Sequence, residues 1–188
     1  MILAIARVDS VVQQINKNFF QLFGIAEIFE VDQESLAEKY RGLQVEVHPD
    51  QFANAPESEK LRAVQLSSYL NEAYGTLKAP LKRAAYLLSL HDLNVEQVDQ
   101  AELGMELLVE QIQLREFLEE LPEDESALAE LESLKSEVFR KLEQRQQSFS
   151  SNLEISDLIA AKKNFNEMQF LSKLLKEIES GEEKRMGY

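Results

Sequence analysis

The sequence predicts a nearly all-helical protein, and three observations support that fold class. Leu, Glu, Gln, Ala and Lys, which favour helices, dominate the chain. Six Gly and four Pro in 188 residues leave few places where a helix must break. Apolar residues recur at helical spacing in several long stretches, and the apolar content of 44% is that of a folded protein.

The first half of the chain predicts two antiparallel helices joined by a polar loop. A short apolar turn at residues 19–23 precedes them and should end at Gly24, a natural helix stop. Asp32 is a candidate cap for the first long helix, which should end before Pro49 because the residue before a proline avoids helical geometry. Its apolar face is predicted to consist of Leu36, Tyr40, Leu43 and Val47.

The second helix of the pair is predicted to follow a loop over residues 51–57, with Ser58 as its cap. We expect Pro80 to interrupt it and the strongly apolar stretch 81–90 to resume as a helix. Its predicted apolar face consists of Leu61, Val64, Leu70, Tyr74 and Leu77.

Three longer helical stretches follow a polar break at residues 91–99. Short connections between long helices favour an antiparallel three-helix bundle. The helices are predicted at about 101–121, 126–149 and 155–179, with Gly181 closing the last one. The domain organisation that we predict is an extension of unassigned role at 1–17, a helical-hairpin domain at 18–93 and a bundle domain at 94–188.

Composition and charge exclude several classes of function. The absence of Cys rules out a disulfide and a thiolate metal site, and two His are too few for a His-rich one. Residues 94–188 hold 22 acidic and 11 basic residues, a net charge of −11 within a chain at −14. Such a surface repels phosphate, so nucleic acid is not an expected partner. No apolar run is long enough to span a membrane, and we expect no cofactor.

The tripeptide His48-Pro49-Asp50 is the motif that carries a functional hypothesis. It falls in the polar loop between the two predicted helices. Pro49 stiffens the backbone, and Asp50 is an acceptor suited to an Arg on a partner. The structural alternative is that His48 caps the preceding helix and Asp50 caps a turn.

The surroundings of this tripeptide resemble the J domain of DnaJ-class co-chaperones over residues 18–78. Tyr40-Arg41 precedes the loop and Leu70-Asn71-Glu72-Ala73-Tyr74 follows it. The segment from Pro80 to His91, PLKRAAYLLSLH, is similar to the HscB family, the specialised J proteins of iron–sulfur cluster assembly. Glu110-Gln111 and Leu114-Arg115-Glu116 extend the resemblance into the second domain.

The resemblance implies a cytoplasmic, monomeric co-chaperone that is not itself an enzyme. Its implied partners are a DnaK-type chaperone like HscA, whose ATPase it stimulates, and an iron–sulfur scaffold like IscU, which it delivers. The implied chaperone-binding residues are His48, Pro49, Asp50, Lys39 and Arg41. Only these two basic residues lie on the helix before the loop, so electrostatic steering should be weaker than in many J domains.

A second apolar face on the helix at 101–121 predicts a binding patch. Leu103, Leu107, Leu114, Leu118 and Leu121 form the core stripe. Met105, Leu108, Val109 and Ile112 lie on another side with Glu116 and Glu120, and Phe170 projects from the core stripe of the last helix. Antiparallel packing of the first and third helices is predicted to join them in one exposed patch, which the resemblance implies is the scaffold site. The alternative is that this second apolar face is an additional part of the bundle core.

Two other functions compete with this interpretation. A general DnaJ-like co-chaperone for unfolded clients would share the tripeptide, but the chain lacks a Gly/Phe-rich linker and Cys-rich zinc modules. A helical adaptor outside the chaperone system would carry the tripeptide by coincidence. An ATPase assay and a scaffold pull-down separate the three.

Overall fold

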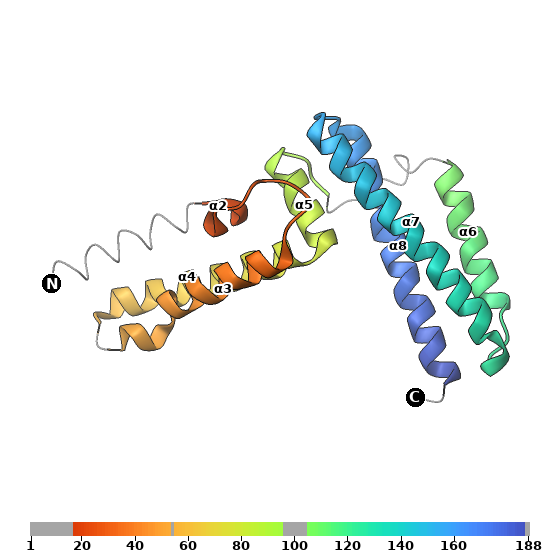
Figure 1. The fold of residues 1–188 in the computed structure, drawn as a ribbon, viewed down its shortest axis with the longest axis horizontal. Helices are drawn as coiled ribbons and strands as arrows, with labels where there is room; N and C mark the ends of the chain where they lie inside the picture. Colours follow the sequence, from red (N-terminus) through yellow and green to blue (C-terminus); the bar gives the residue numbers. More distant parts are fainter. Residues whose placement is uncertain (1–16, 54, 96–104, 187–188) are drawn as a thin grey trace. The chain divides into compact units, whose positions relative to one another are not determined.

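The computed structural model of the chain describes residues 17–53, 55–95 and 105–186. All regular structure in these ranges is helical, as predicted (Figure 1). The chain divides into two compact units between Leu87 and Leu88, and each unit is described by itself. Within the described ranges, no helix is both long enough and apolar enough to cross a bilayer.

The N-terminal unit is built on an antiparallel hairpin of two helices, as the sequence predicts (Figure 1). A short α2 precedes the hairpin, and α5 follows it and continues across the boundary between the units. The elements are α2 (Phe19–Phe23), α3 (Gln33–Val47), the 3-10 helix η1 (Pro49–Phe52), α4 (Glu57–Lys78) and α5 (Pro80–Leu90).

Local signals fix the ends of the first helices where the sequence predicts them. Asn18 and Gln21 form a reciprocal capping box at the start of α2. Gly24 ends that helix in the left-handed region, at φ 58°, which glycine adopts without strain. Asp32 caps α3 by accepting from the amides of Glu34 and Ser35, and α3 ends before Pro49.

The predicted start of α4 is wrong, and its predicted apolar face is confirmed only in part, since Leu70 and Leu77 are buried. The helix begins at Glu57 after Pro56, so Ser58 lies inside its first turn. Leu61 and Val64 are exposed. The buried residues of α4 are Ala63, Leu66, Leu70, Ala73 and Leu77.

Arg83 and Tyr86 on α5 tie the hairpin to the segments before it. The guanidinium of Arg83 is buried, donates to the carbonyls of Phe29 and Leu77, and lies 5.0 Å from the centre of the Phe29 ring. Burial lowers the pKa of Arg83 from its ordinary value. Tyr86 stacks on Phe19 and accepts a hydrogen bond of 3.0 Å from its amide. These contacts anchor α2 and the loop before α3.

The C-terminal unit is a three-helix bundle, also as predicted. Its elements are α6 (Met105–Glu120), the 3-10 helix η3 (Glu125–Ala127), α7 (Leu128–Glu154) and α8 (Leu158–Arg185). The prediction that Gly181 closes the last helix is wrong, because α8 continues for another turn to Arg185. Arg185 donates to the carbonyls of Gly181, Leu121 and Pro122, and these contacts hold the last turn of α8 against the end of α6.

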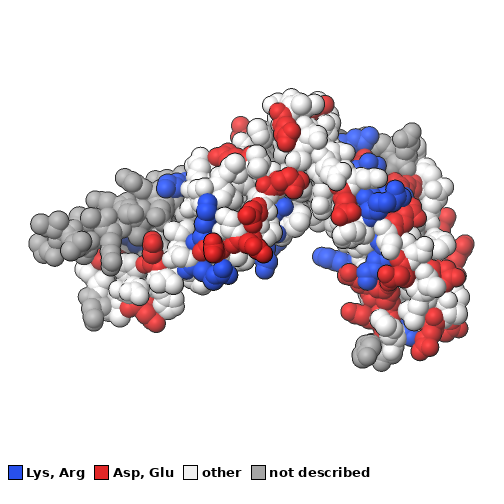
Figure 2. Space-filling view, in the orientation of Figure 1, with Lys and Arg blue, Asp and Glu red and all other residues white. Residues whose placement is uncertain are grey.

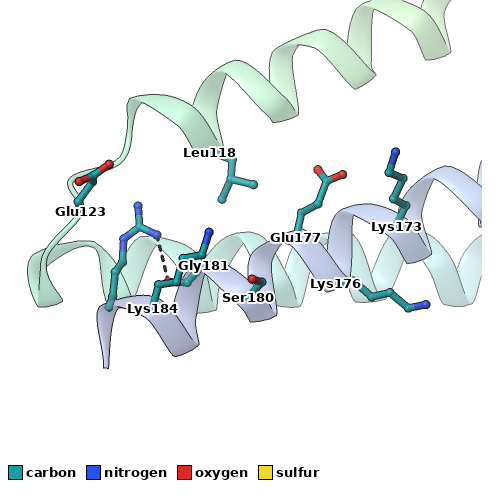
Figure 3. Close-up of a pocket in the computed structure, with 9 residues that line it drawn as sticks. Leu118, Glu123, Lys173, Lys176, Glu177, Ser180, Gly181 and Lys184 are labelled. Atoms are coloured by element: carbon teal, nitrogen blue, oxygen red, sulfur yellow. Dashed lines mark hydrogen bonds between the residues drawn. The ribbon is translucent and has the colours of Figure 1, made fainter. Parts of the chain in front are cut away.

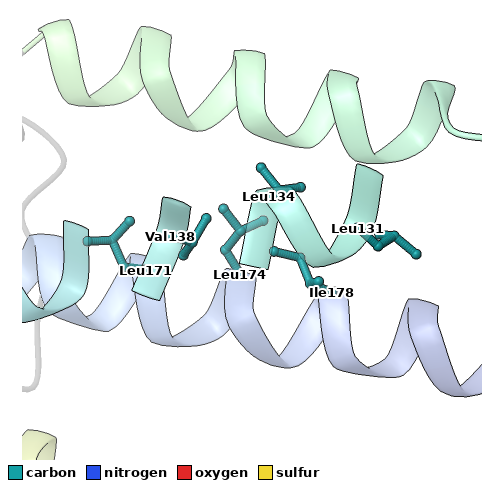
Figure 4. Packing of buried hydrophobic residues seen from close by; sticks show 6 residues of the cluster. All are labelled: Leu131, Leu134, Val138, Leu171, Leu174 and Ile178. Carbon is teal, nitrogen blue, oxygen red and sulfur yellow. The ribbon is translucent and has the colours of Figure 1, made fainter. Parts of the chain in front are cut away.

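The core of the bundle lies between α7 and α8 (Figure 4). Six buried aliphatic residues from these helices interlock there: Leu131, Leu134, Val138, Leu171, Leu174 and Ile178. The predicted stripe of α6 is confirmed in part, since Leu114, Leu118 and Leu121 pack against this cluster. Leu103 and the side chain of Leu107 lie outside what the structure describes.

The helices α6 and α8 run parallel, which corrects the predicted antiparallel pairing of the first and third helices. Arg115 pairs with Glu177 at 3.6 Å, and further along both helices Arg185 donates to Leu121. The partners therefore advance in the same direction on both helices, as Figure 1 also shows. Consecutive helices joined by short loops are antiparallel, so the first and third must be parallel.

Candidate functional site

The loop between α3 and α4 presents the tripeptide on a short, internally closed turn. The amide of Asp50 donates a hydrogen bond of 3.3 Å to Nδ1 of His48, so the imidazole caps the 3-10 turn that starts at Pro49. The side chain of Asp50 is 90% exposed and that of His48 53% exposed. The turn therefore holds itself together and leaves a carboxylate free for a partner.

The capping alternative holds only in part. His48 is the C-cap residue of α3, as that alternative expects, but its side chain caps the turn that follows by accepting from the amide of Asp50. The Asp50 carboxylate receives no backbone hydrogen bond in the described loop, and Oδ2 lies 3.5 Å from Nδ1 of His48. The side chain of Pro49 lies outside the described residues.

The two basic residues on α3 are placed differently. Lys39 donates a hydrogen bond of 3.1 Å to the carbonyl of Gly24, so its ammonium holds the end of α2. Arg41 is exposed, and among the described residues it has no ion pair. Arg41 is therefore the better-placed cation for attracting a partner to the N-terminal unit.

Polar and aromatic contacts fix the two helices that carry the loop. Tyr40 and Tyr74 stack with ring centres 4.1 Å apart, and the Tyr40 hydroxyl donates to Asn71 at 2.8 Å. Gln44 donates to the same hydroxyl at 3.1 Å. Sequence reasoning assigned Tyr40 only to an apolar face and missed this bridge, because helical spacing does not reveal a hydrogen bond between helices.

The predicted patch of the C-terminal unit is exposed on the outer face of α6. Met105, Val109 and Ile112 are 75%, 45% and 56% exposed. Glu116 and Glu120 follow on the same helix and are also exposed. Large apolar side chains that stay in water beside carboxylates are typical of a surface that binds another protein.

Leu108 and Phe170 correct the prediction that every patch residue is exposed. Leu108 is half-buried, and Phe170 is half-buried with its ring packed against the α7–α8 core. Arg115 of α6 pairs with Glu177 of α8, and the two helices run parallel. Leu108 precedes Arg115 by seven residues and Phe170 precedes Glu177 by seven, so Leu108 and Phe170 lie at the same level along the helices. Both are less exposed than Met105, Val109 and Ile112.

Comparisons with known proteins agree over nearly the whole chain. A curated co-chaperone HscB homologue from Aeromonas salmonicida is 37% identical over 166 residues, which are 88% of this chain and 96% of the relative. The chain belongs to the HscB family of co-chaperones. The HscB family model described as the HSCB C-terminal oligomerisation domain matches residues 103–179, which include all the patch residues.

Solved HscB structures share the fold. The chaperone HscB from Vibrio cholerae is 36% identical, with a TM-score of 0.80 over 89% of this chain and 99% of that one. The crystal structure of human co-chaperone protein HscB is 31% identical, with a TM-score of 0.81 over 88% of this chain and 82% of that one. An HscB fold therefore carries the loop and the patch.

Proposed function

We propose that this HscB-family chain is a J-domain co-chaperone that stimulates the ATPase of a dedicated DnaK-type chaperone like HscA. The exposed Asp50 carboxylate, on a turn closed by His48, is the observation that carries the proposal. Because this carboxylate accepts no hydrogen bond from the described part of the chain, it can accept a charge-assisted hydrogen bond from an Arg of the chaperone. Arg41 supplies positive charge on the adjoining helix.

The second half of the proposal is that the C-terminal unit holds an iron–sulfur scaffold like IscU. The apolar patch on α6 supports it, since burying Met105, Val109 and Ile112 against a partner removes exposed apolar surface from water. Glu116 and Glu120 restrict the partner to one that places basic groups at the edge of the contact. The cargo is the scaffold with its cluster, which the chain binds as a client.

The two surfaces together define the role. One chain that contacts a chaperone through α3 and its loop, and a scaffold through α6, raises the local concentration of that scaffold at the chaperone. We propose that the chain assists iron–sulfur protein maturation in this way, in the cytoplasm, without being an enzyme. A general co-chaperone would stimulate the ATPase but would not bind the scaffold.

The test combines two measurements on the full chain. Steady-state ATP turnover by an HscA-type chaperone is measured with this protein, with an IscU-type scaffold, and with both. The proposal expects stimulation by this protein and a further increase when the scaffold is present. Stimulation without scaffold binding supports the general co-chaperone, and neither effect supports the helical adaptor.

The proposed monomeric state has its own test. The description of the matching family model names oligomerisation, so the question is open to measurement. Light scattering across the concentrations used for the ATPase assay should give the mass of one chain. A dimer mass throughout that range would overturn the monomer.

A further inference from the structure

A hollow beside the proposed scaffold patch is lined by lysines. It has a volume of about 780 Å³ and lies between the C-terminal end of α6 and the second half of α8. Figure 3 shows Leu118 projecting into it from α6, with Lys173 and Glu177 projecting from α8 on the side that faces α6. Lys176 and Lys184 also line it.

The basic residues of this hollow outnumber the acidic ones. Lys173, Lys176 and Lys184 are exposed, and the described residues include no ion-pair partner for any of them. Two acidic residues also line the hollow: Glu177, which pairs with Arg115 of α6 at 3.6 Å, and Glu123. With Arg185, four basic residues line the hollow against these two acidic ones, so its lining carries an excess of two positive charges.

Two other lysines of the same unit are paired, whereas Lys163 is exposed and has no ion pair in the described chain. Lys135 pairs with Glu182, and Lys141 pairs with Glu110 and Glu137. In a half-chain of net charge −11, pairing is easy to achieve. Figure 2 likewise shows basic side chains lying among acidic ones on the visible face of the C-terminal helices. A hollow whose cations stay unpaired in such surroundings is suited to an acidic ligand.

The hollow continues the patch along the same pair of helices. Lys173 follows Phe170 by three residues, so the two side chains are neighbours on the surface of α8. The Arg115–Glu177 pair lies beyond Leu108 and beside the hollow. A partner seated on Phe170 and the outer face of α6 therefore meets Lys173 at the edge of the apolar contact.

We propose that this lysine hollow binds an acidic segment of the scaffold-type partner, as a second, electrostatic contact beside the apolar patch. This inference rests on the proposed scaffold-binding function. The acids of α6, Glu116 and Glu120, and the lysines of α8 then impose opposite charges on two parts of the partner. That pattern fixes the orientation of the partner, since a reversed one would bring like charges together.

The contact should act mainly on the rate of association. Exposed charges at the edge of an interface steer encounter and are screened by salt, whereas buried apolar contacts govern dissociation. Binding by the wild-type protein should therefore weaken as salt rises from about 50 to 300 mM, because the Debye length shortens over that range. We expect the charges of Lys173 and Lys184 to cause part of this salt dependence of binding.

The experiment measures association and dissociation rates of an IscU-type scaffold on the full chain. The test variant is Lys173→Glu/Lys184→Glu, and the control is Arg62→Glu/Arg140→Glu, which makes the same charge change at two exposed positions without ion pairs in the described chain. We expect the test variant to associate about tenfold more slowly or worse and to lose much of its salt dependence. The control should change by about twofold or less.

The outcomes separate this inference from the proposed function. If wild-type protein does not bind the scaffold, the proposed function fails and the hollow has no such ligand. If binding is weakened by Val109→Ala/Ile112→Ala but is unaffected by the lysine reversals, the function stands and the electrostatic contact is wrong. Equal slowing by both charge-reversed variants would mean that net charge alone steers the partner. Lysine-dependent capture of inorganic phosphate with unchanged scaffold kinetics would likewise overturn the proposal.

Discussion

The amide of Asp50 bonds to Nδ1 of His48, so the two ends of the tripeptide are joined through backbone and imidazole. An Nδ1 that accepts this hydrogen bond carries no proton itself. The contact uses the main chain of Asp50 and leaves its carboxylate 90% exposed. A substitution at Asp50 can therefore remove the charge without opening the turn, because the backbone amide closes the turn and the side chain supplies the charge.

The substitution Asp50→Asn should remove stimulation of the chaperone's ATPase while leaving the fold intact. Asn keeps the backbone amide that bonds to His48, and it loses the negative charge that a partner Arg would bind. Losing one charge-assisted hydrogen bond of about 1.5–3 kcal/mol corresponds to an affinity loss of about ten- to a hundredfold. ATP turnover over a range of co-chaperone concentrations measures this effect.

A matched variant tests whether charge alone explains the result. Glu46→Gln removes an exposed negative charge from the last turn of α3, close to the loop in sequence. It should stimulate the ATPase like the wild type. Stimulation by Asp50→Asn at wild-type levels would show that the carboxylate is not the contact.

Tyr40→Phe should lower the stability of the helical hairpin by about 0.5–1.5 kcal/mol. The change deletes the hydroxyl that donates to Asn71 and accepts from Gln44, but keeps the ring that stacks on Tyr74. Tyr74→Phe is the matched control, because its hydroxyl makes no hydrogen bond within the described chain. Denaturant midpoints that shift equally for both variants would show that the bridge between α3 and α4 adds nothing.

Arg83→Met should destabilise the N-terminal unit by about 2–4 kcal/mol, because it leaves buried carbonyl groups without their donor. Arg83 donates to Phe29 and Leu77, and Met can fill the volume but cannot replace those bonds. The neighbouring exposed Lys82→Met should change stability by less than about 0.5 kcal/mol. A melting temperature for Arg83→Met that matches the Lys82→Met value would contradict the anchoring role.

Helical content, the order of the elements and the position of the loop could all be predicted from the sequence, since each depends on local signals. Asp32, Gly24 and Pro49 act on the backbone within one turn, and the structure confirms all three. The prediction that Gly181 ends the last helix failed because a glycine inside a helix costs only about 1 kcal/mol. Long-range contacts of Arg185 with the end of α6 offset that cost.

The exposure of the candidate patch residues was predictable only in part. Projection on a single helix correctly placed Met105, Val109 and Ile112 away from the core. It failed for Leu108 and Phe170, which are half-buried; the ring of Phe170 packs against the α7–α8 core, a contact that the projection of one helix cannot show. The lysine hollow was missed for the same reason, because its two walls come from segments far apart in the sequence.

The double substitution Val109→Ala/Ile112→Ala tests the patch without disturbing the core. Both side chains are largely exposed, so the melting temperature should change little, whereas Phe170→Ala would also remove packing from the α7–α8 core. Fully burying such a side chain is worth at most about 1.5–3 kcal/mol, and Ala retains part of it. We therefore expect scaffold affinity to fall by about ten- to a hundredfold, with ATPase stimulation in the absence of scaffold unchanged.

The control for this last prediction removes apolar surface elsewhere on the same unit. Phe139→Ala/Ile155→Ala shortens two residues that are 54% and 73% exposed, outside the predicted patch. If any exposed apolar surface served equally well, both double variants would lose affinity for the scaffold in titration calorimetry. A loss confined to Val109 and Ile112 assigns binding to α6, and full affinity in a folded Val109→Ala/Ile112→Ala protein places the scaffold on another surface.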